Sequence, residues 1–125
     1  MGEDFITANE RRAFTRLAVN APVHVRQGKS VWELELIDLS LTGLAVTEPD
    51  DLSADYSSPF TFNLTLEPVG TIELHGHLIH MEHGCIGFDI GHLDDAHLDP
   101  LAQLLSERLG ADLIKAELAL LKPEH

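Results

Sequence analysis

Arginine is scarce in this sequence and is concentrated near its N-terminus. The 125 residues carry 21 Asp and Glu against eight Lys and Arg, which gives a formal net charge of −13. Three of the five arginines, Arg11, Arg12 and Arg16, fall within six residues. A guanidinium group binds the oxygens of phosphates and carboxylates through paired hydrogen bonds. The run therefore indicates an anion-binding site, with local ion pairing to the acids at positions 3, 4 and 10 as the alternative.

A second short motif has the residue types to hold a ligand. Residues 38–43 have the sequence DLSLTG, which combines a carboxylate, a hydroxyl and a glycine. Asp38 can accept hydrogen bonds and Ser40 can donate one. Gly43 permits a positive φ and a close approach to the backbone. The same residues also suit a simple turn in which Asp and Ser bond to their own backbone, but together with the arginine run they favour ligand binding.

Alternating apolar residues predict a β-rich framework for both motifs. Trp32, Leu34 and Leu36 would share one face of a half-buried strand, and the residues from Phe60 onward alternate in the same way. Turn-forming residues separate these stretches. We predict six strands, over residues 21–27, 31–38, 44–47, 60–67, 71–81 and 85–90. The tight turns between most of them predict a closed or nearly closed antiparallel barrel.

After residue 91 the apolar spacing becomes helical. One group of leucines follows the helical period, namely Leu98, Leu101, Leu104, Leu105 and Leu109. A second helical stretch is expected from about residue 111 to residue 121. Residues 1–16 show no sustained period, so we expect them to form a flexible arm that carries the arginines. Residues 17–122 are expected to form one domain, a barrel with C-terminal helices.

The two motifs together resemble the signatures of the PilZ family, R-x-x-x-R and [D/N]-x-S-x-x-G. The matching positions, in chain order, are Arg12, Arg16, Asp38, Ser40 and Gly43. The dipeptide Gly87-Phe88 in the last predicted strand is similar to a third, weaker family feature. The resemblance covers nearly the whole chain. It implies a mainly β protein with a six-stranded antiparallel PilZ-type β-barrel and C-terminal α-helices.

The resemblance also implies a ligand, the bacterial second messenger cyclic di-GMP, with its two phosphates and two guanines. Arginines 11, 12 and 16 suit the phosphates and the O6/N7 edge of guanine. Asp38 suits the N1 and N2 donors of guanine, Ser40 can donate to a base or phosphate, and Gly43 completes the pocket. In PilZ proteins a basic residue just before R-x-x-x-R accompanies an intercalated dimer of the ligand, so Arg11 implies two molecules per site.

His80 is a further candidate for ligand contact. In some PilZ proteins an aromatic residue near this position stacks on the ligand, so the resemblance extends to the imidazole of His80. The alternative is a plain surface residue on a strand.

A receptor or adaptor, and not an enzyme, is the function that the resemblance implies. The sequence has no recognised nucleophile motif and no glycine-rich phosphate loop. We expect binding to order the N-terminal arm against the barrel, and an unidentified downstream partner protein to recognise that form. Motility and biofilm formation are the usual settings of such domains. The alternative function is a protein-interaction module of the same fold that binds no nucleotide.

The eight histidines include a pair, His75 and His77, that would share one strand face and could meet one ion. No helical H-x-x-x-H pair and no C-x-x-C motif accompanies them. A metal-dependent enzyme is therefore the weakest of the three functions. We expect exposed neutral histidines, no metal site, and no cofactor other than the ligand cyclic di-GMP.

Charge and hydropathy narrow the expected partners and location. A net charge of −13 disfavours nucleic acid polymers and anionic membranes as partners. No apolar stretch approaches the roughly 20 residues that span a bilayer. The N-terminus lacks the apolar segment of a signal peptide, and the single cysteine suits a reducing compartment. We therefore expect a cytoplasmic protein.

Overall fold

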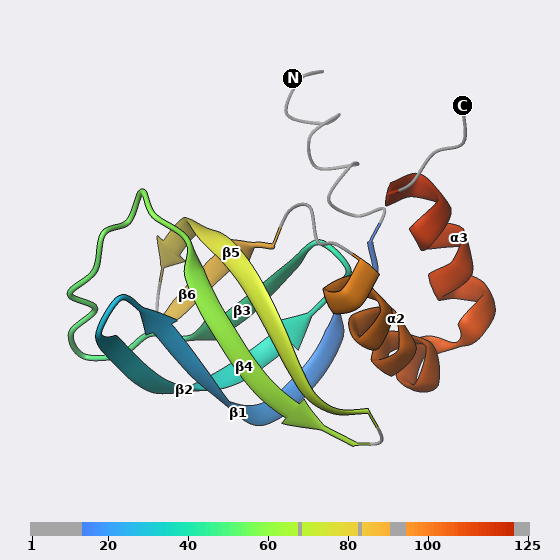
Figure 1. The fold of residues 1–125 in the computed structure, drawn as a ribbon, viewed down its shortest axis with the longest axis horizontal. Helices are drawn as coiled ribbons and strands as arrows, with labels where there is room; N and C mark the ends of the chain where they lie inside the picture. The colour runs from blue at the N-terminus through green and yellow to red at the C-terminus, as the bar shows by residue number, and fades with distance from the viewer. Residues whose placement is uncertain (1–13, 68, 83, 91–94, 122–125) are drawn as a thin grey trace.

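The computed structural model describes residues 14–67, 69–82, 84–90 and 95–121 (Figure 1). Over these residues the chain forms six strands and two helices. The strands are β1 (Leu17–Gln27), β2 (Ser30–Leu39), β3 (Gly43–Thr47), β4 (Phe60–Leu66), β5 (Gly70–Glu82) and β6 (Cys85–Asp89). The helices are α2 (Asp95–Leu109) and α3 (Ala111–Leu121).

The strands form a closed antiparallel barrel in the order β1-β2-β3-β6-β5-β4, with β4 pairing back onto β1. The predicted fold class is therefore confirmed. The first strand begins at Leu17 and not at residue 21, because a bulge between Ala18 and Ala21 hides its regular alternation. Two more bulges interrupt β2 near Ile37 and β5 near Ile79. Each bulge adds one residue to its strand and shifts the phase of the side chains beyond it.

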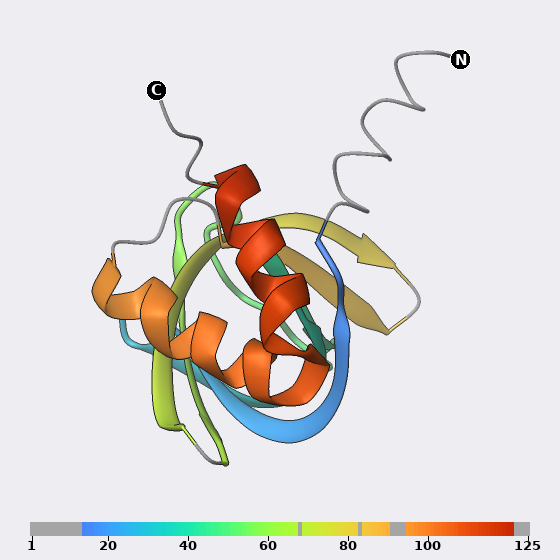
Figure 2. The same ribbon diagram turned by 90° about the vertical axis from the view of Figure 1, so that its right-hand side faces the viewer.

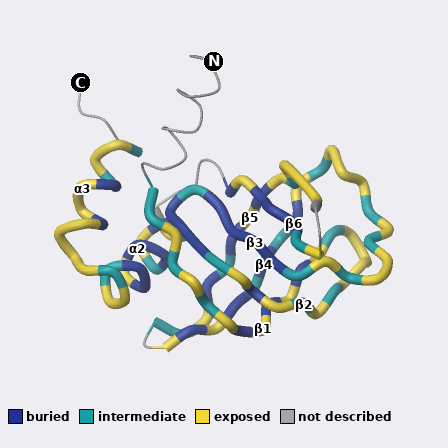
Figure 3. Tube along the Cα trace, turned by 180° about the vertical axis from the view of Figure 1, so that it is seen from behind, coloured by how far each residue is buried: buried dark blue, intermediate teal, exposed yellow. Residues whose placement is uncertain are grey.

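The interior of the barrel is filled by the apolar residues of each alternating strand. Figure 3 shows the resulting alternation of buried and exposed positions along the strands. Three aromatic rings form the centre of the core: Phe88 meets Phe60 and Phe62 edge to face, with centroids 5.2 Å and 4.7 Å apart. This geometry is the favoured one for aromatic pairs.

The two helices gather at one end of the barrel (Figures 1 and 2). The predicted leucine stripe of α2 is buried in the barrel core through Leu98, Leu101, Leu104 and Leu105. Gly110 then adopts a φ of 109° and ends α2, so that α3 can fold back beside it. Of the helices described, none is both long and apolar enough to cross a membrane.

Candidate functional site

Arg16 and Asp38 bring the two sequence motifs together. Arg16 directly precedes β1, and Ala18 pairs with Asp38 where β2 ends. The antiparallel register therefore places the Arg16 side chain beside Asp38, and its Nη1 donates to Asp38 Oδ1 over 2.9 Å. The Arg16 side chain is 49% exposed and the Asp38 side chain 25%. A half-exposed guanidinium of this kind has further N–H donors that a ligand can use.

Ser40 stabilises the turn between β2 and β3. Its Oγ accepts hydrogen bonds from the backbone N–H groups of Thr42 (3.2 Å) and Gly43 (3.1 Å). Its own N–H donates to the Gly43 carbonyl over 2.8 Å. The residue is only 2% exposed. In this conformation the hydroxyl serves the turn, so a direct bond from Ser40 to a ligand stays a prediction.

Of the two reasons given for Gly43, the positive φ does not apply, and the close approach of a ligand to its backbone stays a prediction. The prediction of a positive φ was wrong: among the described glycines a positive φ occurs at residues 28, 70, 84 and 110. A Cβ on Gly43 would lie 2.8 Å from the carbonyl oxygen of Phe88 on β6. The missing side chain thus allows β3 and β6 to pair closely beside the cavity described next.

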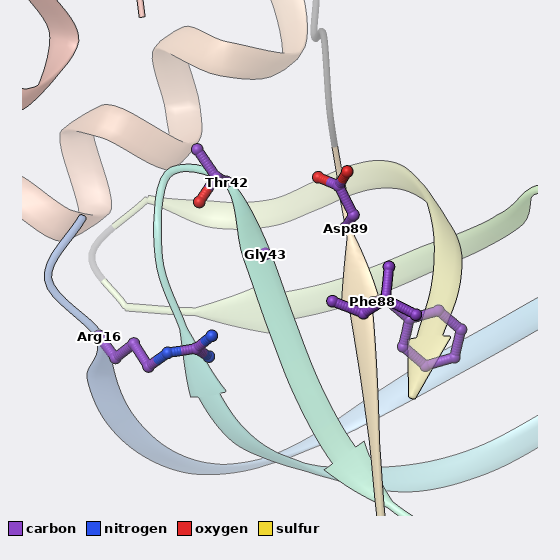
Figure 4. A pocket seen from close by; sticks show the side chains of 6 residues that line it. Arg16, Thr42, Gly43, Phe88 and Asp89 are labelled. Carbon is purple, nitrogen blue, oxygen red and sulfur yellow. The ribbon is translucent and has the colours of Figure 1, made fainter. Parts of the chain in front are cut away.

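A cavity of about 180 Å³ opens on the outer surface, next to Arg16. Its lining residues are Arg16, Thr42, Gly43, Ile79, Phe88 and Asp89. Figure 4 shows the Arg16 side chain extending from the start of β1 toward β3, with Asp89 on β6 at the opposite border. The cavity therefore has an arginine, paired with Asp38, on one side and an aspartate on the other.

Neither Ile79 nor Asp89 was predicted as a site residue, and two further lining residues, Thr42 and Phe88, were named only as parts of sequence motifs. Asp89 pairs with Gly43 across β3 and β6, which are far apart in sequence. Ile79 is the extra residue of the β5 bulge, and the residue is 46% exposed. The only sequence signal was an aspartate at the end of the last predicted strand.

His80 lies next to the cavity but is not one of its lining residues. It is exposed on β5 and pairs with Gly87 of β6. A Cβ on Gly87 would overlap the His80 imidazole, so the ring lies directly over this glycine. Contact between His80 and a ligand stays a prediction, as do the roles of Arg11 and Arg12, which lie outside the described residues.

A buried carboxylate on α3 holds the residue just before Arg16. Glu117 is 4% exposed, and its Oε2 accepts from the Thr15 N–H (2.9 Å) and from Thr15 Oγ1 (2.7 Å). Among the described residues, its Oε1 has no hydrogen-bond partner. This role was not predicted from the sequence. The feature that could have indicated it is the position of Glu117, three residues after Ile114, which places both on the buried side of α3.

The fold defines the class of the protein as a small closed six-stranded β-barrel domain with C-terminal helices. Residues 10–107 match the PilZ domain family. The chain belongs to this family, as the two motifs predicted.

Solved structures of known proteins share the fold. The PilZ domain of Escherichia coli YcgR with c-di-GMP superimposes with a TM-score of 0.65 at 14% identity, covering 92% of this chain and 99% of that one. The PilZ domain of CeSA from a cellulose-synthesizing bacterium gives 0.60 at 21% identity, covering 75% and 97%. Bacillus subtilis inhibitor of motility MotI/DgrA gives 0.65 at 17% identity. That match covers 78% of this chain but only half of MotI/DgrA.

Proposed function

We propose that this chain is a cyclic di-GMP receptor that binds its ligand at the outer cavity beside Arg16 and Asp38. The observation that carries the proposal is the 2.9 Å contact between these two residues. It joins the R-x-x-x-R and D-x-S-x-x-G motifs at a cavity bordered by β3 and β6. Membership of the PilZ domain family supports the same ligand, as does the bound c-di-GMP of the YcgR domain.

The chemistry of the cavity lining, together with Asp38 beside Arg16, suits a guanine nucleotide. The Arg16 fork can bind a phosphate or the O6/N7 edge of guanine. Asp38 and Asp89 offer carboxylate oxygens, which match the N1 and N2 donors on the other edge of the base. We assign Gly43 to leaving room beside the ligand and Ser40 to holding the turn that carries Asp38.

The size of the cavity supports a role for the N-terminal arm. Pockets for drug-sized ligands usually measure about 300–1,000 Å³, whereas this cavity measures about 180 Å³. A dinucleotide would therefore extend beyond it across the outer surface, where His80 lies. Arg11 and Arg12, which come just before the described residues, would then hold the remaining phosphates and bases. A second, intercalated ligand molecule would use Arg11.

The proposed output is a change in the arm that a partner protein recognises, without catalysis by this chain. The bonds between Thr15 and Glu117 support this route, because they link the root of the arm to α3. Ordering of the arm on binding would thus be transmitted to α3, at the helical end of the barrel. A cytoplasmic setting in motility or biofilm control fits this role.

Isothermal titration of cyclic di-GMP into the full chain tests the proposal. The variant is Arg16→Ala, and the matched control is Arg26→Ala. Arg26 is also an exposed arginine at β1, but it contacts Asn63 on the neighbouring strand and not the cavity. Because a paired arginine–guanine contact contributes about 1–3 kcal/mol, Arg16→Ala should weaken binding about tenfold or more, and Arg26→Ala should not.

Stoichiometry and amide exchange complete the experiment. A ratio near two would support the intercalated dimer, and slower exchange in residues 5–20 on saturation would support ordering of the arm. Absence of binding by the folded wild type would refute the proposal that this chain is a cyclic di-GMP receptor. It would favour the alternative, a protein-interaction module that binds no nucleotide.

A further inference from the structure

Three side chains able to ligate a metal converge where α2 meets β5. Glu73 and His75 come from β5, and His97 comes from the first turn of α2. Their nearest ligand atoms all lie within 4.8 Å of one another. None of the three lines the cavity beside Arg16, so this cluster is separate from the proposed receptor site.

Strand geometry brings the first two ligands together. Glu73 and His75 are two residues apart and therefore project from the same face of β5. His75 Nε2 lies 2.9 Å from Glu73 Oε2. The ring of His97 meets the His75 ring edge to face, with centroids 5.5 Å apart and planes at 87°. Two imidazoles and a carboxylate thus face one small volume from two separate elements.

Thr61 on β4 orients the His75 ring. Its Oγ1 lies 3.3 Å from His75 Nδ1, and the two residues pair directly across β4 and β5. When Nδ1–H donates to the threonine hydroxyl, Nε2 keeps its lone pair for a metal on the Glu73 side. The hydroxyl can accept from Nδ1–H or donate to Nδ1, and in the first arrangement it supplies the outer hydrogen bond that usually accompanies a ligating histidine.

We propose that Glu73, His75 and His97 bind a divalent ion of the Zn²⁺ class, with water completing a tetrahedron. Bonds of about 2.0–2.1 Å in a tetrahedral site put ligand atoms roughly 3.4 Å apart. The observed separations, 2.9 Å between His75 and Glu73 and no more than 4.8 Å for any pair, bracket this value, so small rotations of these exposed or partly exposed side chains suffice. The net charge of −13 further favours a cation.

An ordinary surface ion pair is the competing interpretation, and the chain contains one for comparison. His24 Nε2 lies 3.3 Å from Glu33 Oε2 across β1 and β2. Within the described residues, that pair belongs to no group of three potential ligands, whereas His75 does. From the sequence alone we expected no metal site, and the pair considered as the alternative was His75 with His77. The structure adds His97 of α2 beside His75, and this additional ligand supports a metal site.

Metal binding would fasten the first turn of α2 to the barrel. Three ligands from two elements act as a cross-link that exists only in the folded chain, so the metal should stabilise the native state. The bound metal would therefore lie at the end of the barrel that carries the helices, the same end at which α3 and its Glu117 lie.

The test is a titration of tag-free full-length protein with Co²⁺, followed by displacement with Zn²⁺. The wild type should bind one Co²⁺ with the absorption bands of a tetrahedral site and lose them to Zn²⁺. The His97→Ala and Glu73→Gln variants should bind about tenfold more weakly or worse. The matched control, His24→Ala, should bind like the wild type.

Thermal unfolding gives a second measurement that does not depend on the spectrum. Zn²⁺ should raise the Tm of the wild type and of His24→Ala by several degrees, and should have no such effect on His97→Ala. The proposal is overturned if the wild type shows no stoichiometric binding, or if His97→Ala binds as tightly as the wild type. It is equally overturned if His24→Ala loses as much affinity as His97→Ala.

Discussion

The contact between Thr15 and Glu117 makes a quantitative prediction about the root of the N-terminal arm. Thr15 donates twice to one oxygen of Glu117, from its N–H over 2.9 Å and from its hydroxyl over 2.7 Å. Replacement Thr15→Val removes the hydroxyl donor and keeps the size and β-branching of the side chain. Replacement Thr15→Ser keeps the hydroxyl and is the matched control.

The size of the effect follows from the burial of the acceptor. A hydrogen bond to a charged group contributes about 1.5–3 kcal/mol, and Glu117 is 4% exposed, so solvent cannot readily replace the lost donor. Its other oxygen has no partner among the described residues, which leaves the Thr15 N–H as the remaining donor. The free energy of local opening around Thr15 should therefore fall by about 1.5–3 kcal/mol.

Amide hydrogen exchange at Thr15 reports this opening directly, because the same N–H donates to Glu117. Exchange at position 15 should become about tenfold to a hundredfold faster in Thr15→Val, whereas Thr15→Ser should stay close to the wild type. Exchange in Thr15→Val within a factor of about two of the wild type would refute the assigned role of the hydroxyl. Acceleration in Thr15→Ser but not in Thr15→Val would show that the threonine methyl group, and not the hydroxyl, holds Thr15 in place.

Three further predictions concern the barrel and its loops. Gly43→Ala should destabilise the chain by about 1–3 kcal/mol in urea unfolding, because the new Cβ would lie 2.8 Å from the Phe88 carbonyl; an unchanged midpoint would contradict this packing. Ser40→Ala should cost about 1–3 kcal/mol because two backbone N–H groups lose their acceptor, while the exposed Ser53→Ala should be nearly neutral in the same assay. The hydroxyl of Ser57, followed by that of Ser58, lowers the pKa of Asp55. The contribution of the ionised Asp55 carboxylate to folding stability is therefore present at neutral pH and disappears as the pH falls through this lowered pKa. Asp55→Asn should therefore lower the Tm at neutral pH, and its difference from the wild type should shrink as the pH falls through and below the ordinary pKa range of Asp; a difference that stays constant with pH would contradict the assignment.

Local patterns in the sequence are sufficient to predict most of the elements. The alternation from Phe60 to Leu66 and the leucine spacing of α2 directly reflect which side chains enter the core. They predicted six strands and two helices close to their observed bounds, and the two motifs predicted the family. Arg16 and Asp38 were named as site residues, and the structure brings them into contact.

Features that depend on strand pairing could not be predicted in the same way. Asp89 borders the cavity because β6 pairs with β3, and no local pattern encodes that register. The side chain of Ile79 reaches the surface through a bulge, which breaks the period-two rule on which the strand predictions rest. The case of Gly43 shows a related limit: the glycine was correctly singled out, but the close approach of another strand, and not its own φ, explains it.

The alternation of side chains in the barrel separates the outward-facing residues of the proposed ligand site from those that keep the chain folded. Arg16, Ile79 and Asp89 project outward with much of their surface exposed, whereas the aromatic core faces inward. Substitutions at these outward positions therefore remove little buried apolar area. In evolutionary terms, the surface can gain, alter or lose a ligand over many generations while the same barrel persists beneath it.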